Sequence, residues 1–428
     1  MMIKRLMVIL LVFVLVGTFF RIAVAQEFTF KEIWKSPQLT EAEGGIMKLV
    51  AADINGNKIK EIVVSDIGFV YLPKNPMVMV IEYNGSTFEE KWQKKWHDIF
   101  DERNQFKTLQ HIVNPKVWTI FQRTVLEIHP PFFMLEWLEG RYVLHEQYEE
   151  GISEANLKSW VWNWPEKDHA IAQADLNGDG KDEIITFERF KANFPEGVMR
   201  VRRMEPGFPV IWKTDIKESF NPTVFIGKFS PSGRNELYAP PLLLSFIKDD
   251  QYKIDWIPLR SSPKIEGLYS SLDYSSAGST SIKNKTELWV TSASYGGKKP
   301  LVRFTPNQAG SEFIGKQIPF RSHNNFLGIA RLALGDLDND GLDEVVFSEG
   351  TGRLGPEDPE GGRDILDLKE YLHVLKWDGK KYSTVWISKP FLGNVFISQI
   401  LVDDVTGDGI PEIVVATGKG TLHIFQKE

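Results

Sequence analysis

Apolar and polar residues alternate along most of the chain with a period close to two, which predicts strands rather than helices. The pattern is clearest between residues 327 and 388. Four successive strands are predicted there, at Leu327–Leu334, Glu344–Phe347, Tyr371–Trp377 and Tyr382–Ser388. The Asp378-Gly379 pair predicts a tight turn between the last two strands. We therefore expect an all-β fold built from units of four antiparallel strands, with Glu349–Asp364 as a flexible surface loop.

An acidic loop of nine residues, followed by a strand rich in β-branched residues, occurs four times. Position 1 is aspartate, positions 3 and 5 carry Asp, Asn or Thr, and position 9 is glutamate. The four loops are Asp53–Glu61, Asp175–Glu183, Asp336–Glu344 and Asp404–Glu412, and we name each by its first residue. Two further segments keep the closing glutamate, at Glu236 and Glu287, but have lost the acids at positions 1 and 5.

A second motif, an aromatic residue followed four positions later by tryptophan, counts the repeated units independently. Five copies are complete, and weaker copies occur at Tyr142…Glu146 and Phe313…Gln317. The complete copies are Phe30…Trp34, Phe88…Trp92, Phe208…Trp212, Tyr252…Trp256 and Tyr382…Trp386. Seven units of about 58 residues, each made of short strands, are typical of propeller blades. We expect these tryptophans to pack between blades.

The two ends of the chain complement each other. After Glu412, the segments Ile413–Thr417 and Thr421–Gln426 leave the last unit with three strands, whereas Phe28–Lys35 is an isolated fourth-strand motif. Pairing the two removes two open sheet edges. The sequence therefore predicts a seven-bladed β-propeller of four-stranded blades over residues 26–428, with the last blade closed by the N-terminal strand. Two separate β domains are the alternative.

Residues 1–25 have the layout of a secretory signal peptide. Lys4 and Arg5 precede the apolar run Leu6–Phe20, and Ala23-Val24-Ala25 provides a small-residue cleavage pattern. The apolar run is short for a membrane span, although an uncleaved anchor is the alternative. We expect a secreted protein, extracellular or periplasmic, with no membrane insertion after the signal is removed.

Composition narrows the chemistry. The 428 residues are 42% hydrophobic and 25% charged and contain no cysteine, which excludes disulfides, thiolate metal sites and cysteine nucleophiles. The net charge of −7 and the absence of basic blocks argue against a nucleic-acid partner.

The acidic loops carry the clearest chemistry. Carboxylate or amide oxygens at positions 1, 3, 5 and 9, with a carbonyl from position 7, suit a hard cation such as Ca²⁺. The loops contain no histidine, which argues against zinc or copper. The candidate ligands are Asp53, Asn55, Asn57 and Glu61; Asp175, Asn177, Asp179, Lys181 and Glu183; Asp336, Asp338, Asp340, Leu342 and Glu344; and Asp404, Thr406, Asp408, Ile410 and Glu412.

The number of carboxylates ranks the four loops. It places the Asp336 loop first, the Asp175 and Asp404 loops next, and the Asp53 loop last, because Asn57 replaces an acid there and Lys58 replaces a glycine. The segments at Glu236 and Glu287 are not expected to bind metal. Since their glutamates persist without the other ligands, the closing glutamate is also interpreted as a brace for hairpin amides.

The four loops resemble the calcium-binding FG-GAP or VCBS-type repeats of integrin α-subunit propellers and of many secreted bacterial proteins. The resemblance extends over nearly all of residues 26–428. It implies a β-propeller with structural calcium in the first hairpin of certain blades, on the face opposite the usual ligand-binding loops.

Two classes of function remain open. A non-catalytic module that binds an extracellular protein or glycan is favoured, and Trp160, Trp162 and Trp164 are candidates for its ligand face. The same tryptophans are also compatible with simple packing. The alternative is a secreted carbohydrate-active enzyme, a polysaccharide lyase or hydrolase, for which we predict no catalytic residue. Five polar residues near the starts of innermost strands were considered for it: His97, Asp98, His169, Arg321 and His323.

Overall fold

The structure is a computed structural model, and every regular element in its described residues is a β-strand. Within those residues, no helix has the length and apolar character that crossing a membrane requires. The described residues are 28–39, 47–66, 77–95, 116–120, 123–128, 133–146, 168–189, 197–205, 207–218, 223–262, 275–291, 301–307, 310–357, 363–391 and 396–428.

The strands of the described residues form seven sheets, and six of these are antiparallel with four strands each. Three are β2 (Met47–Ala52), β3 (Glu61–Asp66), β4 (Met77–Tyr83) and β5 (Phe88–Lys95); β6 (Lys116–Ile120), β7 (Arg123–Ile128), β8 (Phe133–Leu138) and β9 (Arg141–Glu146); and β10 (Asp168–Ala174), β11 (Glu183–Arg189), β12 (Gly197–Arg203) and β13 (Val210–Ile216). Three more are β14 (Phe225–Gly227), β15 (Glu236–Ala239), β16 (Leu242–Lys248) and β17 (Gln251–Trp256); β23 (Phe326–Gly335), β24 (Glu344–Glu357), β25 (Arg363–Trp377) and β26 (Tyr382–Ile387); and β27 (Ile397–Asp403), β28 (Glu412–Thr417), β29 (Leu422–Lys427) and β1 (Phe30–Lys35).

The remaining described sheet has five strands rather than the predicted four. Its members are β19 (Ser275–Gly278), β20 (Glu287–Val290), β21 (Leu301–Pro306), β22 (Phe313–Ile318) and β18 (Leu259–Ser262). After β17, the chain crosses to this sheet, and β18 pairs with β22 in parallel, with Leu259 opposite Phe313. The extra strand covers an edge that would otherwise expose unpaired backbone groups.

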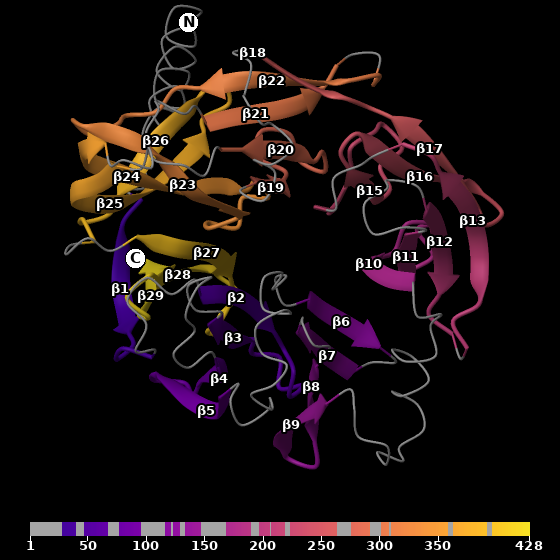
Figure 1. Ribbon diagram of the computed structural model, residues 1–428, viewed down its shortest axis with the longest axis horizontal. Helices are drawn as coiled ribbons and strands as arrows, with labels where there is room; N and C mark the ends of the chain where they lie inside the picture. The colour runs from indigo at the N-terminus through magenta and orange to yellow at the C-terminus, as the bar shows by residue number, and fades with distance from the viewer. Residues whose placement is uncertain are drawn as a thin grey trace, which may run out of the picture.

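The seven described sheets lie side by side around a common centre, with strands such as β2, β6, β10 and β27 innermost (Figure 1). Side-chain amides join some innermost strands. The amide of Gln399 donates to the carbonyl of Leu49 and accepts from its N–H at 3.0 and 2.7 Å, and Gln173 makes the same pair of bonds to Thr119. This arrangement is β-propeller-like.

The N-terminal and C-terminal strands meet in one sheet. β1 runs antiparallel to β29, with Phe30 opposite Lys427 and Lys35 opposite His423, so the two ends of the colour scale lie together in Figure 1. The pairing continues past β1, where the Ser36 N–H donates to the Leu422 carbonyl at 3.0 Å. The last sheet therefore contains three C-terminal strands and one N-terminal strand.

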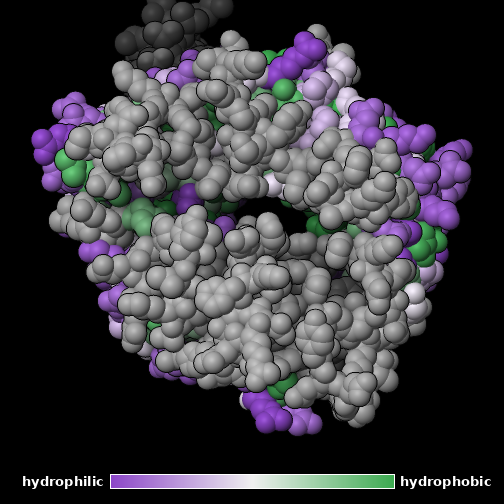
Figure 2. Space-filling view, in the orientation of Figure 1, coloured by the Kyte–Doolittle hydropathy of each residue, from purple (hydrophilic) through white to green (hydrophobic). Residues whose placement is uncertain are grey.

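The hydrophobic core lies largely between neighbouring sheets. The predicted aromatic motif contributes to it: Trp34 of β1 packs on Phe88 of β5 at a centroid distance of 5.4 Å, and Trp386 of β26 packs on Phe30 at 4.9 Å. Fully buried aliphatic residues such as Val414 belong to the same core cluster as Trp34 and Phe88. By contrast, the described residues visible at the outer edge are mainly hydrophilic (Figure 2).

The prediction of a flexible loop at Glu349–Asp364 is wrong for the described residues 349–357 and 363–364, whereas residues 358–362 lie outside the described residues. β24 continues to Glu357 and β25 begins at Arg363, with Leu354 paired to Ile365. Gly350, Gly352, Gly355 and Pro356, which suggested a loop, lie in β24. Glu349 itself is completely buried, which local composition did not indicate. Residues 1–25, His97, Asp98, Trp160, Trp162 and Trp164 lie outside the described residues.

Candidate metal centre

All four acidic loops connect the first and second strands of a sheet. The Asp53 loop joins β2 to β3, the Asp175 loop β10 to β11, the Asp336 loop β23 to β24, and the Asp404 loop β27 to β28. In each, the closing glutamate is the first residue of the second strand and is at most 2% exposed. The hairpin position predicted from sequence is therefore confirmed, and it directs the polar loop side chains back over a buried carboxylate.

The position-1 aspartate shapes each loop by accepting backbone N–H groups. In the Asp175 loop, Oδ1 accepts from Gly178 at 2.6 Å and Oδ2 accepts from Gly180 at 3.0 Å. Gly180 has a φ of +84°, which suits glycine because other residues pay a steric cost in the left-handed region. Lys58 occupies the same position of the Asp53 loop with a φ of +73°, so that loop keeps the turn without the glycine.

The closing glutamate braces its hairpin as well as offering oxygen. In all four loops Oε2 accepts the N–H of the position-2 residue, at 2.6 to 3.0 Å. Glu236, where the other ligands are lost, accepts from the Ser230 N–H and hydroxyl at 2.7 Å and from the Ser245 hydroxyl at 2.8 Å. The bracing role inferred from sequence is thus present where no metal is expected.

Burial makes the charged form of these glutamates costly. It raises the pKa of Glu61, Glu183, Glu344 and Glu412 to about 7, and the loop aspartates or a neighbouring glutamate add to the effect. Hydrogen bonds from the position-2 amides oppose this rise. A carboxylate in such surroundings is stabilised by a nearby cation, either a metal ion or a protein side chain.

The Asp175 and Asp404 loops have ligand sets that fit calcium. In the Asp175 loop, the Asn177 amide bridges Asp179 Oδ2 and Glu183 Oε1, at 3.3 and 2.6 Å, so these oxygens surround one point. In the Asp404 loop, the Thr406 hydroxyl donates to Glu412 Oε1 at 3.0 Å. The acids at positions 1 and 5 of both loops are close enough to add to the raised pKa of the closing glutamate, and the neutral donors can turn away to make room for an ion.

The Asp336 loop is different because a lysine lies among its carboxylates. Ligand oxygens of Asp336, Asp338 and Asp340 lie within 4.8 Å of one another. Lys376 of β25 places its Nζ 2.9 Å from Asp338, 2.7 Å from Asp340 and 2.7 Å from Glu344. Burial alone would lower the pKa of Lys376, but hydrogen bonds to Asp340, Glu344 and Asp338 raise it above its usual range. The ammonium group occupies the centre that a metal ion would take.

In the Asp53 loop, the third strand supplies an acid instead. Glu82 of β4 accepts from Asn55 Nδ2 at 3.3 Å and from the Tyr142 hydroxyl. The strand registers place Glu82 at the position equivalent to Lys376. Phe88 and Tyr382, the aromatic residues that begin the fourth-strand motifs, pair with Tyr83 and Trp377. Glu82 and Lys376 each lie one residue before that partner. Asp53 Oδ1 is buried without a hydrogen-bond partner among the described residues. Glu82 and Asp53 both add to the raised pKa of Glu61 by charge repulsion, and the buried Asp53 oxygen is available to a cation.

Sequence analysis missed both Lys376 and Glu82. The loop spacing identifies ligands within nine residues, but Lys376 and Glu82 come from the third strand, 32 and 21 residues beyond their closing glutamates. The sequence signal for them is the fourth-strand motif. Counting back from its first aromatic residue across the preceding turn, such as Asp378-Gly379, leads to the third-strand residue that faces the loop. That count depends on the hairpin register, which the structure provides.

Neighbouring hairpins also contact one another. Asn339 donates to the Gly409 carbonyl at 2.8 Å, Lys60 pairs with Asp403 at 2.6 Å, and Asn235 donates to the Asp175 carbonyl at 3.3 Å. Further contacts link the segments at Glu236 and Glu287 to each other and to the Asp336 loop. We call this series of six hairpins the hairpin belt, comprising residues 53–61, 175–183, 230–236, 279–287, 336–344 and 404–412.

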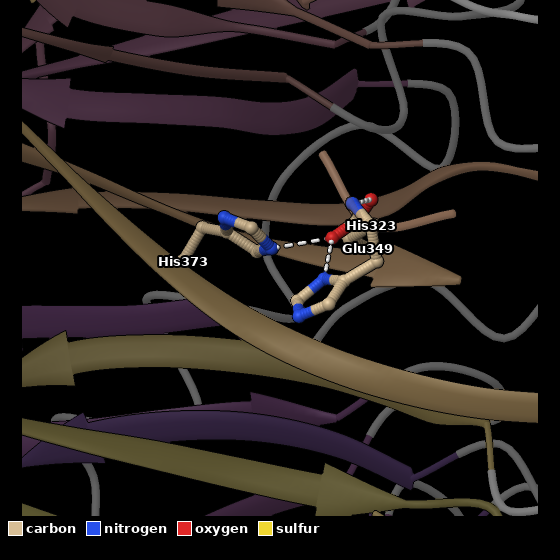
Figure 3. Close-up of side chains that lie close together, drawn as sticks. All are labelled: His323, Glu349 and His373. Carbon is tan, nitrogen blue, oxygen red and sulfur yellow. Dashed lines mark hydrogen bonds and ion pairs between the residues drawn. The ribbon is translucent and has the colours of Figure 1, made fainter. Parts of the chain in front are cut away.

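The residues considered for an enzymatic group are only partly brought together. His323 contacts Glu349 and His373, two residues that sequence analysis did not select (Figure 3). Arg321 lies near Thr384, to which its backbone N–H donates. His169 lies in β10, without a described side chain.

Comparisons with known proteins identify no family. No protein-family model and no curated protein sequence matches the chain. Among solved structures, the N-terminal domain of Nup159 is 9% identical with a TM-score of 0.44, over 94% of this chain and 96% of that one. The Bacillus licheniformis rhamnogalacturonan lyase is 12% identical with a TM-score of 0.40, over 94% and 76%. The Vibrio cholerae biofilm matrix protein Bap1 is 12% identical with a TM-score of 0.34, over 94% and 84%. At these scores the similarities assign no function to this chain.

Proposed function

We propose that the chain is a secreted, calcium-stabilised, seven-bladed β-propeller of the FG-GAP or VCBS type that binds an extracellular protein or glycan without catalysis. The seven sheets of the described residues, arranged around a common centre, support the assignment of seven blades. The antiparallel pairing of β1 with β29 supports closure of the last blade by the N-terminal strand. The signal-like residues 1–25 support export to the periplasm or the cell exterior.

One observation carries the calcium proposal: buried glutamates with a pKa near 7 lie beneath clusters of loop oxygens in four hairpins. In the Asp53, Asp175 and Asp404 hairpins, neighbouring acids add to the raised pKa of the glutamate, whereas the Asp336 hairpin already contains the Lys376 ammonium group. We therefore place calcium in the Asp53, Asp175 and Asp404 loops and none in the Asp336 loop, which reverses the order expected from loop composition alone. The ions have a structural role, because the hairpins that hold them lie at one end of the strands, far from the loops at the other end.

Calcium stoichiometry tests this assignment. Isothermal titration of the chelator-treated protein should give three calcium ions per chain, with affinities typical of extracellular modules, about 10⁻⁴ to 10⁻³ M. Asp175→Asn and Asp404→Asn should each remove one ion. Asp336→Asn is the matched control, since it makes the same change in a loop that already holds an ammonium group. Absence of calcium binding would overturn the proposal, and loss of one ion in Asp336→Asn would overturn the assignment to the loops.

The ligand face is proposed on different grounds. Loops on the face opposite the hairpin belt are where a propeller presents variable binding residues. Trp160, Trp162 and Trp164 are close in sequence and of the type that stacks on sugars or anchors a protein interface. Glycan-array binding by the intact protein should be lost in Trp162→Ala and kept in Trp386→Phe, which changes a tryptophan packed between sheets. Equal binding by both variants would exclude the tryptophan loop.

A further inference from the structure

A cluster of two histidines and one glutamate lies in the β23–β26 sheet, away from the hairpin belt. Glu349 is on β24, His373 is on β25, and His323 lies in the segment between β22 and β23 (Figure 3). β24 runs from Glu344 in the hairpin to Glu349 and beyond, so five residues of strand separate the cluster from the Asp336 loop. At about 3.3 Å per residue, the cluster is roughly 16 Å from that loop, toward the opposite face.

The three side chains converge on one carboxylate oxygen. His323 Nδ1 and His373 Nε2 each lie 2.6 Å from Glu349 Oε2, and the His323 backbone N–H donates to Oε1 at 2.7 Å. Potential ligand atoms of all three residues lie within 4.8 Å of one another. No other group of two imidazoles and a carboxylate is that close among the described residues.

Burial gives the cluster an unusual charge balance. Glu349 and His373 are completely buried, whereas the His323 side chain keeps 34% of its exposure. Burial alone would raise the pKa of Glu349, but hydrogen bonds from His373 and His323 lower it below its usual value, so the carboxylate is charged. The ion-pair partners of Glu349 among the described residues are these imidazoles. A buried carboxylate with imidazoles as its partners is an environment in which proteins hold metal ions.

Each of the two rings stacks on an aromatic side chain. His323 stacks on Tyr371 at a centroid distance of 3.8 Å and an interplanar angle of 17°, and His373 stacks on Phe347 at 4.9 Å and 15°. His373 Nδ1 is buried and has no hydrogen-bond partner among the described residues. Its ring is therefore directed at Glu349 by stacking on Phe347 and by the contact of Nε2.

We propose that His323, Glu349 and His373 form a site for a divalent transition-metal ion of the zinc type. The ligands would be His323 Nδ1, His373 Nε2 and a Glu349 oxygen. Two imidazoles and one carboxylate are a three-ligand set that zinc accepts with a fourth position open, whereas the oxygen-only hairpins suit calcium.

Binding requires only a small opening of the cluster. Tetrahedral zinc–ligand bonds of about 2.0–2.2 Å place neighbouring ligand atoms roughly 3.4 Å apart, compared with 2.6 Å between each imidazole nitrogen and Glu349. His323 belongs to a connecting segment and is partly exposed, so it can move outward and open a path to solvent. On binding, each neutral imidazole carries its proton on the outer nitrogen, Nε2 of His323 and Nδ1 of His373.

The test uses the full chain saturated with calcium, so that the hairpins do not compete. Titration with Co²⁺ followed by visible absorption, and with Zn²⁺ by calorimetry, should show one ion per chain and the intense spectrum of a low-coordinate site with nitrogen ligands. Glu349→Gln and His373→Ala should each weaken zinc binding by at least about tenfold.

His423→Ala is the matched control. His423 Nδ1 also contacts a carboxylate, Glu32 Oε1, at 2.5 Å, but no second imidazole converges there in the described residues. This variant should bind zinc as the wild type does. Circular dichroism and a cooperative thermal melt, measured on every variant, report whether the protein is folded. A folded wild type that binds no zinc, or unchanged zinc affinity in folded Glu349→Gln and His373→Ala, would overturn the proposal whether or not the hairpins bind calcium.

Discussion

Replacing Lys376 by methionine should convert the Asp336 loop from a calcium-independent hairpin into a calcium site. Methionine keeps most of the length and apolar stem of lysine but removes the ammonium group. In the wild type, that group contacts Asp338, Asp340 and Glu344 at 2.7 to 2.9 Å, and its side chain is only 22% exposed. Without it, three carboxylates face one another beside Asp336, with no cation at the centre of the loop.

The expected size of the effect follows from this geometry. Removing one partner of a buried ion pair costs about 3–5 kcal/mol, and the partial exposure of Asp340 puts this case near 3 kcal/mol. Calcium should restore most of the loss. For a dissociation constant of about 10⁻⁴ M, 10 mM calcium stabilises the bound state by about 2.7 kcal/mol. The variant should thus be clearly less stable than the wild type in chelator and close to it in calcium.

Two measurements check this prediction. Calorimetric stoichiometry should rise by one calcium ion per chain in Lys376→Met, and the gap in thermal midpoint between variant and wild type should narrow as calcium is added. Lys427→Met is the matched control, because Lys427 lies 3.9 Å from Asp338 and touches the loop only at its margin. If Lys376→Met binds no more calcium than the wild type, the ammonium group does not stand in for a metal ion and the argument fails.

Three further predictions address parts of the fold that need no metal. Glu236→Ala should cost about 2 kcal/mol equally with and without calcium in thermal melts, because it removes three hydrogen bonds to a buried carboxylate. Burial raises the pKa of Glu370 well above its usual value, so wild-type stability should fall as pH rises from about 4.5; Glu370→Gln should melt as the wild type does at pH 5 and higher at pH 8. Gln399→Ala should destabilise more than Gln173→Ala, since both bonds of the Gln399 amide to Leu49 are partly buried, whereas the bonds of the Gln173 amide to Thr119 are exposed and its bond to Asp182 alone is partly buried.

The features that sequence predicted well are those with strong local signals. The acidic loops occur in hairpins because their spacing fixes both the turn and the strand that follows, and the closing glutamate marks the first residue of that strand. The fourth-strand motif was equally informative, since residues such as Trp34 and Phe88 pack across adjacent sheets. Each signal lies within a few residues of the element that it predicts.

The features that sequence missed depend on residues far apart in the chain. The Asp336 and Asp53 loops each receive a third-strand residue, Lys376 and Glu82 respectively, whose facing position depends on hairpin register. The Glu349 environment was missed for the same reason: its partners lie 24 and 26 residues away, and its local composition resembles a loop. β18 was not anticipated, because Leu259–Ser262 gains its partner from the next sheet.

The hairpin belt suggests why one chain can combine three kinds of hairpin. These are the hairpins proposed to bind calcium, the Asp336 hairpin that contains the Lys376 ammonium group, and the segments at Glu236 and Glu287 that have lost the other ligands. Each hairpin contacts a neighbour through backbone carbonyls and short polar side chains, as Asn339 does with Gly409 and Asn235 with Asp175. These contacts require every hairpin to keep its shape, but they do not depend on how that shape is held. A metal ion, the Lys376 ammonium group, or serine hydroxyls bonded to Glu236 can each satisfy the buried glutamate. The shared requirement is a positive or hydrogen-bonding partner for that carboxylate, so the glutamate persists while the groups above it vary.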